Sequence, residues 1–323
     1  MANQIVNRDT RYDEGLIVTD LAMQEIIETI HRISFTDSTI LITGESGTGK
    51  SALARYIHSH SRRADQPFVT INCTTIPDNL IESELFGYVP GAFTSANVKG
   101  KPGLVKTADH GTLFFDEISL LPYQLQAKFL QLIQERSYTP VGSVDVEHVD
   151  VRIIAATNQS LADLMIEHKF REDLYYRLRV IELDIPPLRN RPDAMDPLID
   201  QFLEMYNLRY GFNRSITPSA RNKLKAYKWK GNIRELQYVM ERLVVTARGD
   251  VIDADEIPDL PKDSPEESME TEEKVNFDEA VAAYEQQLLE KAFRKYGSSY
   301  KVAEHLGLSQ SKASRLLRKY GIK

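Results

Sequence analysis

The segment GESGTGKS, residues 44–51, has the residue types and spacing to bind a phosphate chain. It fits the pattern G-x-x-x-x-G-K-[S/T] and directly follows the apolar run TILIT. The glycines of such a loop let backbone N–H groups turn toward phosphates at a helix N-terminus. Lys50 would reach the β- and γ-phosphates, and the Ser51 hydroxyl would bind Mg²⁺. The helical segment that follows, SALARYIHSH, favours a nucleotide loop over a plain glycine-rich turn. The residues expected to hold the nucleotide are Gly44, Glu45, Ser46, Gly47, Thr48, Gly49, Lys50 and Ser51.

Two carboxylates follow a second apolar run, TLFF, as Asp116 and Glu117. An acidic pair at the end of a buried strand is costly unless a cation lies nearby, and Mg²⁺ at the phosphate loop supplies that charge. We expect Asp116 to bind the metal with Ser51, and Glu117 to orient and activate an attacking water. The alternative is an aspartate that caps a helix at a strand end. The order of the two motifs favours hydrolysis.

A third apolar run, VRIIAATN, ends in Thr157 and Asn158. These small polar groups could sense a γ-phosphate from beside the acidic pair. Taken alone, a polar strand end is more often a cap or a turn. Its position after the two stronger motifs favours a role at the nucleotide.

The pattern of the chain predicts which elements must position these groups. From about 16 to 186, the strand-like runs TILITG, PFVTIN, GTLFFDE and VRIIAATN alternate with helical patterns. This alternation predicts an α/β fold whose parallel sheet is covered by helices on both faces. From 187 to 257 the apolar spacing is helical throughout, and Thr217 and Pro218 are typical of a helix start. We expect a small all-helical subdomain there. The full division is a tail at 1–15, the α/β part at 16–186, the helical part at 187–257, a linker at 258–276 and a C-terminal domain at 277–323.

Composition excludes several classes of protein. With 323 residues, 42% hydrophobic and 27% charged, the chain is ordinary globular material. It has neither the long uncharged apolar run of a membrane span nor an apolar signal-peptide core, so we expect a cytoplasmic protein. The single cysteine, Cys73, excludes an intramolecular disulfide and any multi-cysteine zinc site.

Charge is divided by segment, although the net charge is -7. The stretch 259–279 has nine acidic and two basic residues, typical of a solvated linker. The stretch 291–323 has nine Lys or Arg and one Glu, which indicates a basic module of the kind that binds nucleic acid.

The basic module, SYKVAEHLGLSQSKASRLLRKYGI, predicts a short helix, a turn at Gly307 and a second helix capped by Ser309. This is the helix-turn-helix layout, with the second helix in the major groove of DNA; the alternative is a basic hairpin without a DNA role. Its expected internal contacts are Val302, Ala303, Leu306, Leu308, Ala313, Leu316 and Leu317. Its candidate DNA contacts are Gln310, Ser311, Lys312, Ser314, Arg315 and Arg318. An apolar stripe on the preceding helix suits a dimer, and comprises Phe277, Val281, Tyr284, Leu288, Ala292 and Phe293.

A glycine-rich segment, ELFGYVPGAFTSANVKGKPGLV at 84–105, presents Phe93 between Ala92 and Thr94 in what should be a surface loop. A partner protein could use this side chain as an apolar anchor. The residues alone favour the other interpretation, in which Phe93 folds into a local core.

Taken together, the motifs GESGTGKS, NC, ELFG, GAFTSA, GTLFFDE, VRIIAATN, FREDLYYRL and WKGNIREL resemble the AAA+ domain of bacterial enhancer-binding proteins, which activate σ54 RNA polymerase. The resemblance covers residues 16–257. It implies that the loop of Gly91, Ala92, Phe93, Thr94, Ser95 and Ala96 contacts σ54 and moves with the nucleotide state. Ser95 replaces the second glycine usual in the family, which removes some backbone freedom.

The same resemblance assigns roles to single residues. Asn72 matches the asparagine that holds the catalytic glutamate, here Glu117, away from water in one state. Arg171 and Arg177 match the arginine fingers that reach the nucleotide of a neighbouring subunit, which requires a hexameric or heptameric ring. Arg234 matches the sensor II arginine, which touches the chain's own nucleotide. Lys230 replaces a common proline and Ser51 a frequent glutamate.

The C-terminal module resembles the Fis-like and TyrR-like helix-turn-helix domains found in this family. The expected protein is therefore an activator that binds enhancer DNA, hydrolyses ATP with Mg²⁺ and remodels σ54 RNA polymerase into the open complex. The alternatives are a TyrR-like regulator in which ATP controls only assembly, and an AAA+ chaperone or protease subunit, which has no use for a DNA-reading module. Because residues 1–15 are too few for a sensing domain, we expect either a separate regulatory protein or a missing N-terminal domain.

Overall fold

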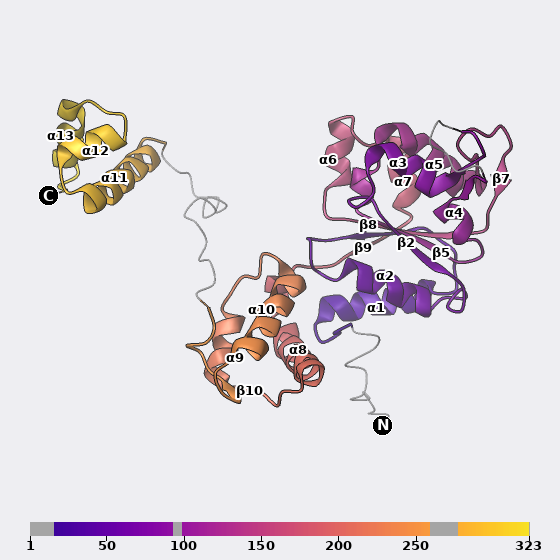
Figure 1. Cartoon of the computed structure of the whole chain (residues 1–323), viewed down its shortest axis with the longest axis horizontal. Helices are drawn as coiled ribbons and strands as arrows, with labels where there is room; N and C mark the ends of the chain where they lie inside the picture. The colour runs from indigo at the N-terminus through magenta and orange to yellow at the C-terminus, as the bar shows by residue number, and fades with distance from the viewer. Residues whose placement is uncertain (1–15, 93–98, 259–276, 323) are drawn as a thin grey trace, which may run out of the picture. The chain divides into compact units, whose positions relative to one another are not determined.

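A computed structural model describes residues 16–92, 99–258 and 277–322. Its contacts divide the chain into two units, Met1–Leu260 and Pro261–Lys323 (Figure 1). No helix among the described residues has the length and apolar character needed to cross a membrane.

The first unit contains a five-stranded parallel sheet, in the order β2-β5-β8-β1-β9. Four strands confirm the apolar runs of the sequence, and the fifth, formed by IELD, was not among them. β1 lies between β8 and β9, so the chain leaves β1 toward the far edge of the sheet, where β2 lies. A parallel sheet has a crevice at its carboxyl edge where connections from neighbouring strands run in opposite directions. The strands are β1 (Ile40–Thr43), β2 (Phe68–Asn72), β5 (Thr112–Asp116), β8 (Arg152–Thr157) and β9 (Ile181–Asp184).

Helices cover both faces of this sheet, as predicted. Figure 1 shows α1 (Leu21–Ile33) and α2 (Lys50–Ser59) on one face, with the other helices of the α/β part opposite. Alternate strand residues supply the two cores: Phe114 packs on the α1 and α2 side, and Phe115 on the other. The opposite face carries α3 (Asp78–Phe86), α4 (Leu104–Thr107), α5 (Tyr123–Glu135), α6 (Leu161–Ile166) and α7 (Glu172–Leu178).

Short elements complete the α/β part. Two antiparallel ladders pair β3 (Gly87–Tyr88) with β4 (Lys101–Pro102), and β6 (Ser137–Tyr138) with β7 (Glu147–His148). A 3-10 turn lies in this part at Ile118–Leu120, and two more, at Leu188–Asn190 and Pro192–Ala194, lead into the helical subdomain.

The helical subdomain predicted at 187–257, called the lid from here on, contains α8 (Met195–Tyr210), α9 (Pro218–Lys225) and α10 (Asn232–Thr246). Thr217 accepts a hydrogen bond from the Ala220 N–H as the N-cap of α9, with Pro218 in the first turn, as the sequence predicts. Trp229 is buried in the lid core and donates from Nε1 to the Leu224 carbonyl at 2.9 Å. The lid also has one two-stranded parallel ladder, of β10 (Ser215–Ile216) and β11 (Val251–Ile252).

A buried ion pair joins the start of α1 to the segment that enters the lid. Asp20 caps α1 by accepting from the Met23 N–H at 3.0 Å, and its other oxygen accepts from Arg191 Nε at 2.8 Å. Arg191 also donates to the Ile17 carbonyl. The Asp20 and Arg191 side chains are 9% and 3% exposed, so each buried charge has the other as its counterion.

Asp20→Asn should therefore lower the free energy of unfolding by about 3 kcal/mol, because it leaves the Arg191 charge buried without a counterion. The cap survives in this variant, since an Asn oxygen also accepts from the helix. Urea unfolding followed by circular dichroism would measure the change. Glu25→Gln, at an exposed position of the same helix, is the matched control. Equal unfolding midpoints for the two variants would contradict this account of the pair.

The second unit is a three-helix domain of α11 (Phe277–Tyr296), α12 (Ser299–His305) and α13 (Gln310–Lys319). Ser309 caps α13, and Gly307 in the turn before it has φ 63°, as predicted. The expected internal contacts are confirmed: Val302, Leu316 and Leu317 form the core with Leu306 and Leu308, and Ala303 and Ala313 are buried.

The expected dimer stripe on α11 is wrong at two positions. Ala292 is buried in the core of this same domain, and Phe293 packs against that core. Both side chains are therefore used within the chain, because the short helices α12 and α13 need a third helix to bury their apolar faces. Leu288 is 37% exposed, whereas the side chains of Phe277, Val281 and Tyr284 lie outside the described residues.

Candidate functional site

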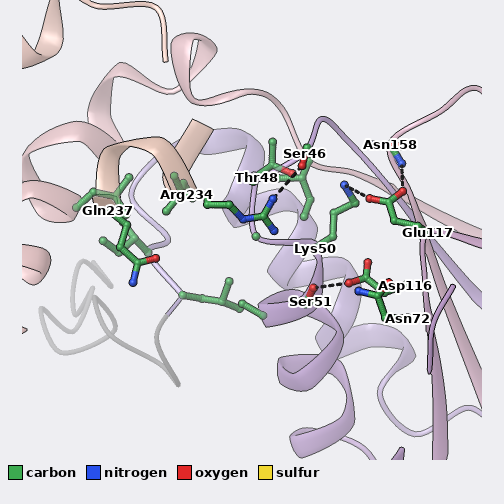
Figure 2. Close-up of a pocket in the computed structure, with 18 of the residues that line it drawn as sticks. Ser46, Thr48, Lys50, Ser51, Asn72, Asp116, Glu117, Asn158, Arg234 and Gln237 are labelled. Atoms are coloured by element: carbon green, nitrogen blue, oxygen red, sulfur yellow. Dashed lines mark hydrogen bonds and ion pairs between the residues drawn. The ribbon is translucent and has the colours of Figure 1, made fainter. Parts of the chain in front are cut away.

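The carboxyl edge of the sheet and the lid enclose a cavity of about 730 Å³. Figure 2 shows the phosphate loop at its centre, the acidic pair on one side and the lid residues Arg234 and Gln237 on the other. The structure thus brings together in one cavity most of the residues that the sequence assigned to the nucleotide. Those that line it are Ser46, Gly47, Thr48, Gly49, Lys50, Ser51, Asn72, Asp116, Glu117, Asn158 and Arg234.

The loop between β1 and α2 has the backbone of a phosphate-binding loop. Gly44 has φ 143°, and a Cβ there would lie 2.7 Å from the Ile185 carbonyl oxygen, so only glycine fits. Lys50 is 6% exposed, and its Nζ donates to the carbonyls of Gly44 at 2.8 Å and Glu45 at 3.1 Å. Burial lowers the pKa of the Lys50 ammonium, while the charges of Glu117 and Asp116 oppose this effect.

The acidic pair ends β5 beside this loop. Ser51 Oγ donates to Asp116 Oδ2 at 3.2 Å, so two oxygen ligands of the kind that Mg²⁺ prefers already converge. Glu117 accepts from the Asn158 N–H at 3.1 Å and lies 3.8 Å from Lys50 Nζ. Its backbone is left-handed, with φ 57° and ψ 54°, a conformation that costs a non-glycine residue energy and is concentrated at functional sites. The residues present therefore fit a magnesium ion.

Asn72 ends β2 directly opposite Asp116 in the sheet register. Its side-chain oxygen accepts from the Thr74 N–H at 2.9 Å, which fixes the turn that leaves the strand. Its predicted pairing with Glu117 stays a prediction.

The lid supplies the wall opposite the acidic pair. Arg234 Nη1 donates to Ser46 Oγ at 3.0 Å, so this side chain lies over the phosphate loop. Gln237, one helical turn further along α10, points into the same cavity (Figure 2).

An apolar wall completes the cavity, and motif-based reasoning missed it. Side chains of this kind suit the faces of a planar base. They come from α1 and the segment before it, from the residue after β9 and from the lid, so no local pattern connects them. They are Leu16, Ile17, Met23, Ile185, Leu198, Phe202 and Ile233.

The two predicted arginine fingers do not line the cavity of their own chain. Arg171 precedes α7 and pairs with Asp173 at 2.7 Å, and Arg177 lies in the last turn of the same helix. Arg171 is held in place by Gln126, a buried residue that the sequence motifs did not indicate. Gln126 accepts a hydrogen bond from the Arg171 N–H at 2.8 Å. Its amide nitrogen also donates to the Leu121 and Lys169 carbonyls at 3.0 Å.

The expected σ54 loop is described only at its start. Gly91, with φ 79°, and Ala92 follow β3, while Phe93, Thr94, Ser95 and Ala96 lie outside the described residues. The β3–β4 ladder pairs the chain before the loop with the chain after it, which places both ends of the segment side by side.

The candidate DNA contacts all lie on α13. Five of them are exposed and Ser314 is half-buried, as expected for the outer face of a recognition helix. The exposed residues are Gln310, Ser311, Lys312, Arg315 and Arg318.

The single cysteine should be unreactive in the native protein. Cys73 is 5% exposed, and burial, with the charges of Asp116 and Glu117, raises the pKa of its thiol to about 12. Because the thiolate is the reactive form, we expect alkylation by iodoacetamide at pH 8 to be at least about 100-fold slower in the folded than in the urea-unfolded chain. Mass spectrometry after timed quenching would measure both rates. Equal rates would show that the thiol is open to solvent.

Three family models match the chain in succession. The sigma-54 interaction domain matches residues 16–184, the AAA+ ATPase lid domain residues 189–274 and a helix-turn-helix domain residues 274–323.

Individual proteins agree with this order. SfnR, a σ54-dependent transcriptional regulator of Pseudomonas fluorescens, is 38% identical over 324 residues, covering 94% of this chain and 88% of SfnR. UacR of Escherichia coli is 42% identical over 97% of this chain, which spans only 55% of UacR. Crystal structures of NtrX from Brucella abortus with ADP and with ATP match with TM-scores of 0.71 and 0.70 at 34% and 33% identity, covering 95% and 97% of this chain and 69% and 70% of NtrX.

Proposed function

The chain belongs to the σ54-dependent transcriptional regulators, and we propose that it binds enhancer DNA and uses ATP hydrolysis to remodel σ54 RNA polymerase into the open complex. One observation carries the enzymatic part: the phosphate loop, the acidic pair and the lid arginine converge on a single cavity of about 730 Å³. The helix-turn-helix domain carries the DNA-binding part.

In this proposal the residues of one chain bind and activate the nucleotide. Lys50 exchanges its two loop carbonyls for the β- and γ-phosphates, and Arg234 approaches them from the lid. Ser51 and Asp116 hold Mg²⁺, which neutralises phosphate charge when it is bound. Glu117 orients the attacking water and accepts its proton. The ATP and ADP complexes of NtrX support this choice of nucleotide.

A neighbouring subunit completes the site. Arg171 and Arg177 lie outside their own chain's cavity, so they act only if another copy presents its nucleotide to them, which calls for a closed ring. There the guanidinium groups stabilise the charge of the transition state. We propose a hexameric or heptameric ring.

The nucleotide controls the σ54 loop through α3. Asn72 ends β2 in register with Asp116, and α3 runs from Asp78 to Phe86, directly before the β3 strand that leads into the loop. A shift of Asn72 toward or away from Glu117 would therefore move one end of a nine-residue helix whose other end supports the loop. Phe93 and Thr94 are the proposed contacts with σ54.

The DNA-binding domain brings the ring to its enhancer. Lys312, Arg315 and Arg318 would neutralise phosphates, while Gln310, Ser311 and Ser314 would face the base edges. Since the proposed partners are DNA and RNA polymerase of a bacterium, we place the protein in the cytoplasm.

The proposal is tested by Thr94→Ala in open-complex assays on a σ54 promoter with purified chain and ATP. We expect this variant to hydrolyse ATP and occupy its enhancer like the parent, yet to form essentially no open complexes, because it has lost a contact with σ54. A template without the enhancer is the control for DNA-dependent recruitment. Open complexes at the parental rate would instead favour a TyrR-like regulator, an alternative suggested by Ser95 in place of the second loop glycine.

A further inference from the structure

Asn232, the first residue of α10, connects three segments that are far apart in the sequence. It is fully buried and left-handed, with φ 54°. Its Oδ1 accepts from the Leu188 N–H at 2.8 Å, and its Nδ2 donates to Glu45 Oε2 and to the Ser46 carbonyl, both at 3.0 Å. A single amide thus joins the lid, the segment leading into it and the phosphate loop.

Glu45 reinforces this junction from the surface. Its two oxygens accept from Arg189 at 2.6 and 2.8 Å, and this arginine holds the pKa of the carboxyl below its usual range, with help from Asn232. The pair is about 40% exposed on each side, so it is weak on its own. The buried amide of Asn232 is the part that water cannot replace.

The phosphate loop also caps the lid helix. The N–H groups of Ile233 and Arg234 donate to the Gly47 carbonyl at 2.9 and 3.3 Å, and α10 has no side-chain cap. The contact is close: a Cβ on Gly47 would lie 2.4 Å from the Gly231 carbonyl oxygen.

These contacts have a consequence for the phosphates. A trans peptide directs its C=O and N–H to opposite sides. Donors from the lid hold the carbonyls of Ser46 and Gly47, so the Gly47 N–H is directed away from the lid contact. The outer side of the loop is therefore fixed by the lid, while its other side lines the cavity.

We propose that Asn232, supported by the Glu45–Arg189 pair, is a positioning residue that clamps the phosphate loop to the lid and holds the loop ready for nucleotide. The inference rests on the proposed ATP hydrolysis and adds the residues that couple lid position to nucleotide affinity. Because the clamp orders the loop before binding, its loss weakens binding by the cost of ordering that loop.

Asn232→Asp is the sharpest variant. It keeps the size of the side chain and the tolerance of a left-handed backbone, but it turns the donor toward Glu45 and Ser46 into an acceptor. We expect the Kd for a fluorescent ATP analogue, and the KM for ATP, to rise about tenfold. Saturating ATP closes the clamp again, so kcat should stay within about threefold of the parent.

Asn207→Asp is the matched control within the lid. Asn207 donates to the Arg214 carbonyl and accepts from the Arg214 N–H, at 2.8 and 2.9 Å, away from the phosphate loop. Parental affinity in this variant, together with the loss in Asn232→Asp, supports the clamp. An equal loss in both would show that general weakening of the lid is responsible, and parental affinity in Asn232→Asp would overturn the inference. In Asn232→Asp, the added change Glu45→Gln should recover part of the affinity, because Gln can donate to Asp.

Amide hydrogen exchange without nucleotide separates this inference from the proposed function. The Ile233 and Arg234 amides should exchange about tenfold faster in Asn232→Asp than in the parent, since their acceptor on the loop is no longer held. If the parent binds no nucleotide, the proposed function is wrong. The exchange rates of these two amides still test whether Asn232 clamps the loop to the lid. Equal protection of these amides in both proteins would refute it.

Discussion

Glu117→Gln is expected to lower kcat for ATP hydrolysis by at least about 100-fold while the nucleotide affinity stays within about threefold of the parent. The amide has the shape of the carboxylate, and its oxygen can still accept from the Asn158 N–H that holds Glu117 at 3.1 Å. It cannot accept a proton from water at neutral pH. The variant therefore removes the proposed general base and leaves the cavity intact.

Phosphate release and analogue binding, measured on the same preparation, test this expectation. Glu182→Gln is the control, because Glu182 is an exposed glutamate on β9 that pairs with Arg179 and does not line the cavity. Its kcat should equal that of the parent. Hydrolysis by Glu117→Gln at more than half the parental rate would remove Glu117 from the mechanism.

Arg177→Ala is expected to lower kcat by about 1000-fold without changing the affinity of the chain for nucleotide. The reason is its position: Arg177 lies in the last turn of α7 and does not line the cavity of its own chain. A loss of hydrolysis would thus report an arginine supplied to another copy. Arg179→Ala, two residues further along, removes a surface arginine paired with Glu182 and should keep parental activity.

Mixing two inactive variants tests the same arrangement directly. An Arg177→Ala subunit retains Glu117, and a Glu117→Gln subunit retains its arginine. In equal mixtures, up to about a quarter of the subunit boundaries of a closed ring would combine the intact residue of each. Hydrolysis should therefore reappear on mixing. A mixture as inactive as its components would contradict catalysis in trans.

The sequence was most informative where the chemistry is encoded locally. Eight consecutive residues specify the phosphate loop because their glycines determine the backbone and the lysine and serine follow at fixed positions. Asp116 and Asn158 could be placed at the same edge of the sheet because parallel strands end there together. The same reasoning explains why four of the five strands of the sheet and the cap of α9 were predicted correctly.

Residues selected by tertiary packing escaped this reasoning. Asn232 and Gln126 hold backbone N–H groups, and Arg189 holds a carboxylate, all more than 40 positions away in sequence. No short sequence pattern records such a partner. The apolar wall around Ile17 is equally non-local. On α11 the helical spacing of the apolar residues is as predicted. Spacing alone does not say whether Ala292 faces another copy or, as found, the helices of its own domain.

The distance in sequence between the two walls of the cavity matters while the protein is being made. Ser46 and Arg234, which touch across it, are 188 residues apart. At ordinary rates of translation, about 10 to 40 s pass between their appearance at the ribosome. Throughout that interval α10 is absent from the nascent chain, so the Ser46 and Gly47 carbonyls lack the donors that hold them in the folded protein. With the loop clamped as proposed, tight binding of nucleotide would begin only once the lid has been synthesised.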